Sequence, residues 1–302
     1  MTLVDEIRDE CARVAARATH VRIETDALAA YAAALPGPPP DPEDRLADGP
    51  PEHRAAFHLA LDAINFGSGW FPTLRKRDGR SGYWTVALGL RDRFAQHGAW
   101  SAEQLHSLTA AQVAETLGQD PDHELMALFA RSLNDLGARV ADDHRGSFLA
   151  VARSAEGSAV ALAERLASWD CFTDASTYEG RRIPFSKRAQ IAASDLHHAG
   201  VVELQDLHRL TLFADNLVPH VLRLDGILRF DPAFAARVER EQQIDHDSPE
   251  EIEMRATAVH AVELIVHERP DLTAQQVDHV LWTKGGGAYK AVPRPRCRCT
   301  AY

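Results

Sequence analysis

Apolar residues recur at helical spacing along most of the chain, and this periodicity constrains the fold more than any other feature of the sequence. In residues 5–35 the apolar positions fall three and four residues apart, which predicts two amphipathic helices. Similar patterns, broken by Gly or Asp-Pro, predict further helices over 52–66, 81–94, 101–117, 122–143, 146–154, 156–168, 186–199, 203–209, 216–225, 231–242, 249–268 and 273–282. Alternating residues around a Glu179-Gly180 turn in 172–185 favour a small β-hairpin. The sequence therefore predicts a mainly α fold with a minor β-hairpin.

The 302 residues contain no interior linker that would divide them and no repeat at a fixed period. A Pro-rich stretch at 36–51, PGPPPDPEDRLADGPP, is incompatible with a helix interior or sheet pairing and is predicted to be a loop, either a linker or a flap. We therefore expect a single domain over residues 1–302.

Acidic residues outnumber basic residues by 44 to 33, which gives a net charge of −11. Such a surface repels polyanions, so a nucleic-acid polymer or an anionic membrane is disfavoured as a partner, whereas a local basic pocket for one phosphate is not. The N-terminus lacks the apolar stretch of a signal peptide, and no run of about 18 apolar residues occurs in the chain. We expect a cytoplasmic protein that acts as a monomer.

The motifs of several common enzyme classes are missing. No phosphate-binding loop, no G-x-G-x-x-G after a strand and no H-E-x-x-H occurs, so ATPase, dinucleotide-binding and zinc-protease functions lack their parts. The four cysteines include one close pair, a C-x-C at Cys297 and Cys299, which fits neither a zinc ribbon nor a disulfide framework. His197-His198 and the stretch 245–247 lack a second set of residues at ligand spacing. We expect neither a metal ion nor a cofactor.

The most informative region lies between residues 183 and 263. Ser186 can cap a helix in which Lys187, Ile191 and Asp195 follow one another at intervals of four, so that two charged residues share an apolar stripe. Further along, in FADNLVPHVL, Pro219 falls within the first turn of a predicted helix and places Asp215 at or next to its N-terminus. The exposed amides and the dipole of a helix favour an ionised carboxylate there, as they also do for an ordinary N-cap aspartate.

Two resemblances give this aspartate a role. The order hairpin, short helix and apolar-Asp-x-x-Val is similar to the catalytic segment of helix-hairpin-helix DNA glycosylases, in which the aspartate stabilises an oxocarbenium-like transition state. More specifically, eight segments in order resemble the queuosine salvage family of queuosine 5′-phosphate N-glycosidases. These segments are INFGSGWF (64–71), SGYW (81–84), GSFL (146–149), FSKRAQI (185–191), LFADNLVPHVL (212–222), EIEMRATAVHAVELI (251–265), LW (281–282) and P-x-x-R-x-R-C-x-x-Y (293–302).

The family resemblance implies an all-α fold related to the helix-hairpin-helix glycosylases, with an active-site cleft formed mainly by 64–84 and 185–302. It makes Asp215 the catalytic carboxylate and Lys187 an active-site lysine. The chain departs from eukaryotic members at 67–69, Gly-Ser-Gly, where a bulkier aromatic residue is expected. The match of the terminal motif implies that the C-terminal segment is ordered and folds back toward the core.

The implied substrate suggests further residues. Asp195 and Glu253 are candidates for reading the guanine-like edge and the amine-bearing side chain of queuine. Asn65 lies in a matched segment and is a further candidate for substrate binding. Aromatic side chains for stacking on the base are drawn from Phe66, Trp70, Phe213 and Trp282. The 5′-phosphate needs local positive charge, for which the candidates are Lys187, Arg188, Arg255 and Arg298.

The resemblance thus implies a small-molecule nucleotide substrate, queuosine 5′-monophosphate, and its hydrolysis to queuine and ribose 5-phosphate without a metal. A fixed carboxylate suits this reaction, because positive charge builds on the ribose as the N-glycosidic bond breaks. Two alternatives remain open at this stage. One is a glycosylase acting on a modified base within DNA or tRNA, which the net charge disfavours, and the other is a non-catalytic queuine or nucleotide carrier.

Overall fold

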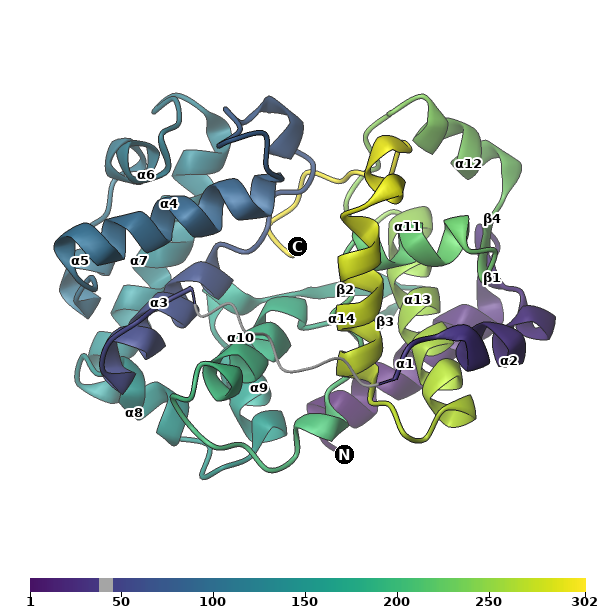
Figure 1. Cartoon of the computed structure of the whole chain (residues 1–302), viewed down its shortest axis with the longest axis horizontal. Coiled ribbons are helices and arrows are strands. Elements are labelled where there is room, and N and C mark those ends of the chain that lie inside the picture. The colour runs from purple at the N-terminus through teal and green to yellow at the C-terminus, as the bar shows by residue number, and fades with distance from the viewer. Residues whose placement is uncertain (38–45) are drawn as a thin grey trace.

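Helices make up most of the computed structural model, which describes residues 1–37 and 46–302 (Figure 1). This confirms the predicted mainly α class. The helices are α1 (Leu3–Arg17), α2 (Thr25–Ala34), α3 (Pro51–Ala63), α4 (Gly82–His97), α5 (Ala102–His106), α6 (Ala110–Leu117), α7 (Glu124–His144), α8 (Phe148–Arg153), α9 (Ala159–Ala167), α10 (Lys187–His198), α11 (Leu217–Leu224), α12 (Pro232–Glu239), α13 (Pro249–Glu268) and α14 (Ala274–Gly285). None of the helices in the described ranges is long and apolar enough to cross a membrane.

Several helix predictions are corrected in detail. The predicted helix over 101–117 is two helices, α5 and α6, and the one over 203–209 is reduced to a 3₁₀ turn at Leu207–Arg209. Half of the predicted Pro-rich loop at 36–51, residues 38–45, lies outside the described residues, and α3 begins at Pro51. Proline suits that first position because its missing N–H would have no partner inside the helix.

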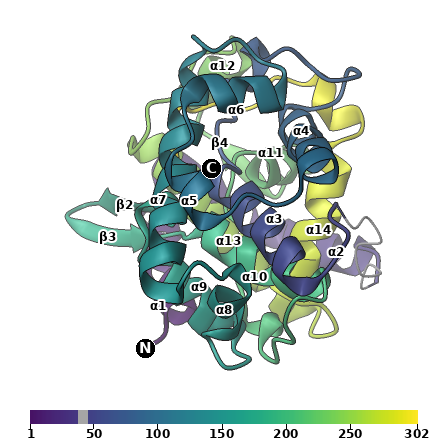
Figure 2. The same ribbon diagram turned by 90° about the vertical axis from the view of Figure 1, so that its left-hand side faces the viewer.

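Two antiparallel strand pairs accompany the helices. The predicted hairpin is present as β2 (Ala175–Tyr178) and β3 (Arg181–Pro184), and both turn residues, Glu179 and Gly180, adopt the positive φ of a tight hairpin turn. Figure 2 shows this hairpin at one edge of the molecule. The second pair, β1 (Val21–Ile23) with β4 (Leu228–Phe230), was not predicted. Three-residue strands from distant parts of the chain leave no periodic signal.

The apolar side chains form two main clusters. The first joins α3–α10, and the second joins α1, α2, α11, α13 and α14. Figure 1 shows α3–α8 on one side of the molecule and α1, α2 and α11–α13 on the other. Helix α10 packs on α3 and α9, whereas α14 packs on α11 and α13. The loops that enter α10 and α11 lie where these two clusters meet.

The C-terminal segment folds back between the two halves (Figure 1), as the terminal motif implied. Tyr302 is buried and its carbonyl accepts a hydrogen bond of 2.9 Å from the Gly67 amide, while Arg188 Nε donates to the Ala301 carbonyl at 3.2 Å. The backbone of this segment lies so close to Gly69 that a Cβ there would be 2.4 Å from the Cys297 carbonyl oxygen. Close backbone approach therefore explains a glycine where a bulkier aromatic was expected.

Candidate active site

Lys187 opens α10 with its side chain buried. Its Nζ donates to the Asn65 carbonyl at 2.9 Å and to Asn65 Oδ1 at 3.3 Å, so two of the predicted site residues are in contact. Burial lowers the pKa of Lys187, and the negative charge of Asp215 opposes this shift. The structure thus brings the predicted lysine and the predicted carboxylate into one electrostatic environment.

Asp215 lies immediately before α11, at the helix N-terminus that the sequence predicted. Its Oδ1 accepts hydrogen bonds from the amides of Leu217 at 2.7 Å and Val218 at 3.0 Å. The side chain is half-buried, and Oδ2 accepts no hydrogen bond from the residues that the structure describes. One oxygen therefore fixes the orientation of the carboxylate and the other stays available.

A second carboxyl group beside Asp215 was not predicted. Asp278, on α14, is buried, and its pKa is held well above the ordinary range by burial and by the charge of Asp215. Its spacing to Trp282, four residues further along the same helix, places both side chains on one face. That spacing was a usable signal, because it puts an acid next to an aromatic residue already in a matched segment.

A group on α3 and α10 adds two more acids, a fully buried Asp62 and a half-buried Asp195. Asp62 is fully buried, and neither of its carboxylate oxygens has a hydrogen-bond partner among the described residues. Burial and the neighbouring Asp195 raise its pKa, and burial raises the pKa of Asp195 to about 7. His58 faces Asp195 at 3.9 Å, but burial lowers the pKa of His58 to about 4, so the pair is not an ion pair at neutral pH.

An aromatic contact joins the two halves of the molecule near these acids. The ring of Tyr83, on α4, meets the ring of Trp282 edge-on with centroids 5.7 Å apart. Burial raises the pKa of Tyr83, and the charges of Asp195 and Asp62 add to the shift. The predicted Trp282 thus lies beside a tyrosine that sequence reasoning missed, although it stands in the matched SGYW segment.

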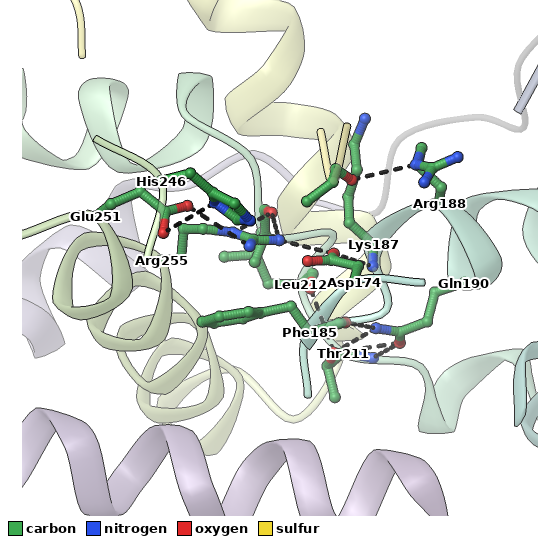
Figure 3. Close-up of polar contacts among 12 residues, drawn as sticks. Asp174, Phe185, Lys187, Arg188, Gln190, Thr211, Leu212, His246, Glu251 and Arg255 are labelled. Atoms are coloured by element: carbon green, nitrogen blue, oxygen red, sulfur yellow. Dashed lines mark hydrogen bonds and ion pairs between the residues drawn. The ribbon is translucent and has the colours of Figure 1, made fainter. Parts of the chain in front are cut away.

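A buried carboxylate holds Lys187 in place. Asp174 Oδ2 accepts a hydrogen bond of 2.9 Å from the Lys187 amide and caps α10, whereas Ser186 has a left-handed conformation and makes no side-chain cap. The prediction that Ser186 caps this helix is therefore wrong. Asp174 also pairs with Arg255 Nη2 at 2.7 Å, and both side chains are buried (Figure 3).

Arg255 and Gln190 connect the segment that precedes Asp215 to the hydrogen bonds around Asp174 and α10 (Figure 3). Arg255 donates to the Ala214 carbonyl from Nε at 3.1 Å and from Nη2 at 3.0 Å. Gln190 exchanges hydrogen bonds with Thr211, accepting from its amide at 2.9 Å and donating to its hydroxyl at 3.0 Å. The FSKRAQ motif therefore positions the segment that carries the catalytic candidate.

Other predicted residues are not brought to Asp215. Glu253 is buried against the opposite end of the fold, where its Oε2 accepts from the amides of residues 19, 20 and 21 and its Oε1 accepts from the Tyr178 hydroxyl. Arg255 is occupied by Asp174 and the Ala214 carbonyl. These contacts indicate a role in supporting the fold for both residues.

The aromatic candidates divide in the same way. Phe66 is buried edge-on against Phe129, and Trp70 Nε1 donates to Glu124 at 2.7 Å while Arg298 lies over its ring. Phe213, in contrast, is mostly buried two residues before Asp215. Of the four predicted aromatic residues, Phe213 and Trp282 are therefore the ones adjoining the candidate site.

Arg294 brings positive charge to Asp215, and further basic residues that were not predicted lie next to Arg294. Arg294 is half-buried, its Nε has no hydrogen-bond partner among the described residues, and burial and Arg296 lower its pKa to about 10 while Asp215 opposes the shift. Burial and then Arg296, Arg294 and Lys290 lower the pKa of Lys76 to about 8. Of the predicted phosphate ligands, Arg188 is instead buried and donates to backbone carbonyls. The alternating arginines at 294, 296 and 298 in the terminal segment were the available signal.

The predicted cleft between 64–84 and 185–302 stays a prediction, as do the single domain, the monomeric state and the cellular location. One cavity of about 480 Å³ lies between α2 and α14, and a smaller one of about 190 Å³ lies beside α1 and the β2–β3 hairpin. Neither cavity is lined by Asp215 or Lys187.

Comparisons with known proteins agree with the resemblance drawn from the motifs. Residues 46–302 match the model of a family described as queuosine salvage protein. A queuosine 5′-phosphate N-glycosylase/hydrolase of Sphaerobacter thermophilus is 36% identical over 292 residues, which cover 90% of each chain. Proteins of the same name from Dictyostelium discoideum and Bos taurus are 28% and 26% identical, covering 80% and 74% of this chain and 76% and 72% of theirs. The chain belongs to the queuosine salvage protein family.

Proposed function

We propose that this chain hydrolyses the N-glycosidic bond of queuosine 5′-phosphate and releases queuine and ribose 5-phosphate. The activity named for its relatives supports this reaction. The observation that carries it is the carboxylate of Asp215, fixed through Oδ1 by two amides at the start of α11. The chemistry of that site, with a buried lysine and a second acid close by, fits glycoside cleavage.

Asp215 acts on the sugar. As the bond to the base breaks, positive charge develops on C1′ and the ring oxygen, and a nearby carboxylate stabilises this transition state more than the ground state. Because Asp215 is already held by the Leu217 and Val218 amides, it needs no reorientation during the reaction. Its free Oδ2 faces the ribose directly or orients the attacking water.

Asp278 acts on the departing base. The base leaves with the electrons of the broken bond and needs a donor that neutralises them. Burial and the charge of Asp215 raise the pKa of Asp278, which favours the protonated form that can donate. Two neighbouring acids in different environments thereby serve the two sides of one bond.

Asp62 and Asp195 recognise the base. A fully buried carboxyl group without a hydrogen-bond partner is costly, and a ligand that supplies N–H donors removes that cost. Queuine offers such donors on its guanine-like edge and on the amine of its side chain. Tyr83 and Trp282 supply the aromatic wall beside these acids.

Arg294, Arg296 and Lys76 hold the 5′-phosphate. Arginine presents several donors in a fixed plane and suits bidentate contact with phosphate oxygens. The unpartnered Nε of Arg294 and its electrostatic contact with Asp215 support placing the phosphate on this side of the ribose. A chain with a net charge of −11 otherwise offers little to attract a polyanion.

Mass spectrometry of the products tests the proposal. The chain is mixed in parallel with queuosine 5′-phosphate, with queuosine and with an intact queuosine-containing tRNA. We expect free queuine and ribose 5-phosphate from the mononucleotide at the highest rate. Equal or faster release from tRNA would favour a polymer glycosylase instead, and binding of the mononucleotide without product over hours would favour a carrier.

A further inference from the structure

Two of the four cysteines meet a histidine outside the candidate active site. Cys297 and Cys299 stand two residues apart in the extended C-terminal segment, so their side chains share a face, and both are buried and reduced. His246 lies in the loop before α13. One ring nitrogen of His246 and the two sulfur atoms all lie within 4.8 Å of one another.

The backbone fixes these three residues together. The Ile244 amide donates to the Arg296 carbonyl at 2.8 Å, and Ile244 and Cys297 form a parallel β-bridge. The loop that carries His246 is therefore paired with the segment that carries the cysteines. Such pairing makes the approach of the ligand atoms a property of the fold and not of freely rotating side chains.

A buried carboxylate completes the group. Glu251, the third residue of α13, is fully buried, and its Oε1 has no hydrogen-bond partner among the described residues. Its Oε2 lies 3.7 Å from His246 Nδ1, as Figure 3 shows, and its Oε1 lies 3.6 Å from Arg255 Nη1. The set is thus two sulfurs, one imidazole and one carboxylate, with Arg255 as a nearby cation.

We propose that Cys297, Cys299, His246 and Glu251 bind a zinc ion that fastens the C-terminal segment to the loop before α13. Thiolates and imidazole are typical ligands of zinc, whereas magnesium and calcium prefer oxygen ligands. Metal–ligand bonds of about 2.0–2.3 Å place tetrahedral ligands roughly 3.3–3.8 Å apart, so the two sulfurs and the imidazole nitrogen, which lie within 4.8 Å of one another, must close in by up to about 1 Å. Binding displaces the two thiol protons to solvent, together with the proton that an imidazolium form of His246 carries on its ligating nitrogen.

Charge and access both fit this ion. Two thiolates, Glu251 and the nearby Asp174 carry four negative charges, which a divalent cation and Arg255 largely balance. The His246 side chain is 36% exposed and lies at the surface side of the group, which gives the ion an entry path. A metal site was not predicted because the C-x-C and the stretch 245–247 each lack a second set of ligands at the usual spacing, and only the fold brings them together.

Zinc binding at this position would hold the C-terminal segment in place. In this segment the Ala301 oxygen accepts a hydrogen bond from Arg188, and the Tyr302 oxygen accepts one from the Gly67 amide. The ion would therefore act on the stability of the fold and take no part in the reaction. This separates the inference from the proposed function, since a metal-binding measurement does not require any enzyme activity.

Cobalt substitution tests the proposal. The full chain, reduced and stripped of metal with a chelator, is titrated with Co²⁺ and then with Zn²⁺. We expect one equivalent of Co²⁺ to give thiolate charge-transfer absorption and the intense d–d bands of a tetrahedral site, which Zn²⁺ abolishes. Zn²⁺ should also raise the melting temperature of the wild-type chain. The absence of these bands in protein with four titratable thiols would overturn the proposal.

Variants locate the site. Cys297→Ser and His246→Ala should each weaken Co²⁺ binding by more than about 100-fold, since ligand loss exceeds the 10–100-fold effect of removing a supporting residue. Cys171→Ser removes another buried thiol and should leave the bands unchanged. Because Cys297→Ser alters a buried residue of the C-terminal segment, His246→Ala, which alters an exposed side chain, is the second test of Co²⁺ binding. Bands that persist in both variants would contradict the assignment.

Discussion

The buried ion pair between Asp174 and Arg255 gives the most quantitative prediction for stability. Both side chains are at most 1% exposed and their closest atoms lie 2.7 Å apart. Replacing Arg255 with Met leaves the buried carboxylates of Asp174 and Glu251 without their shared cation and removes two hydrogen bonds from the Ala214 carbonyl. Loss of one partner of a buried pair costs about 3–5 kcal/mol, so we expect the free energy of unfolding to fall by about 4 kcal/mol.

The double variant separates pairing from packing. In Asp174→Asn/Arg255→Met the Asp174 charge is removed as well, which leaves the loss of Arg255 uncompensated at Glu251, 3.6 Å from Arg255 in the wild type. The oxygen of the introduced asparagine can still accept the amide that caps α10, so the loss should be clearly smaller than the sum of the single effects. Urea unfolding followed by tryptophan fluorescence measures each free energy. Arg22→Met, which breaks the exposed pair with Glu24, is the control and should cost less than about 1 kcal/mol. A loss below about 1 kcal/mol for Arg255→Met would refute the reasoning.

Three further predictions concern pH, backbone packing and phosphate binding. Because the pKa values of Asp195 and Asp62 are raised in the folded state, these groups stabilise the fold most below the unfolded pKa near 3.8, and the contribution is lost as pH rises toward about 7. The melting temperature should therefore decline over this pH range, and Asp195→Asn should make the decline smaller. An unchanged decline in Asp195→Asn would argue against the assignment. Gly69→Ala should lower the melting temperature because its Cβ would clash with a backbone carbonyl, whereas Gly37→Ala, whose Cβ would meet no atom of the described residues within 4 Å, should not. Arg294→Gln should raise KM for queuosine 5′-phosphate by about tenfold or more while changing KM for queuosine little, and equal effects on both would contradict a phosphate contact.

The motifs predicted those site residues whose positions depend on their neighbours in the sequence. FSKRAQ and FADNLVP placed Lys187 at a helix start and Asp215 before a helix N-terminus, and both positions depend on local backbone geometry. The helices themselves followed from the periodicity of apolar residues, as for α1 and α13.

Residues that act through distant contacts could not be predicted in this way. Asp62 lies among apolar residues of α3, and its proximity to Asp195 depends on the packing of α10 against α3. Glu253 was predicted to read the base, but its carboxylate accepts hydrogen bonds from backbone amides at the start of β1. That strand forms by pairing with β4, which is distant in sequence. Local sequence carries no record of such long-range partners.

The central claim is that the charge of Asp215 drives the cleavage, and one comparison tests it most directly. In Asp215→Asn the amide oxygen can still accept from the Leu217 and Val218 amides, so the melting temperature should change little while single-turnover release of queuine from queuosine 5′-phosphate falls by about 10²–10³-fold or more. Asp231→Asn is the matched control, because Asp231 caps α12 through the same pair of contacts, at 2.8 and 3.1 Å, and should retain full activity. Queuine release by Asp215→Asn within about tenfold of the wild-type rate would contradict the account.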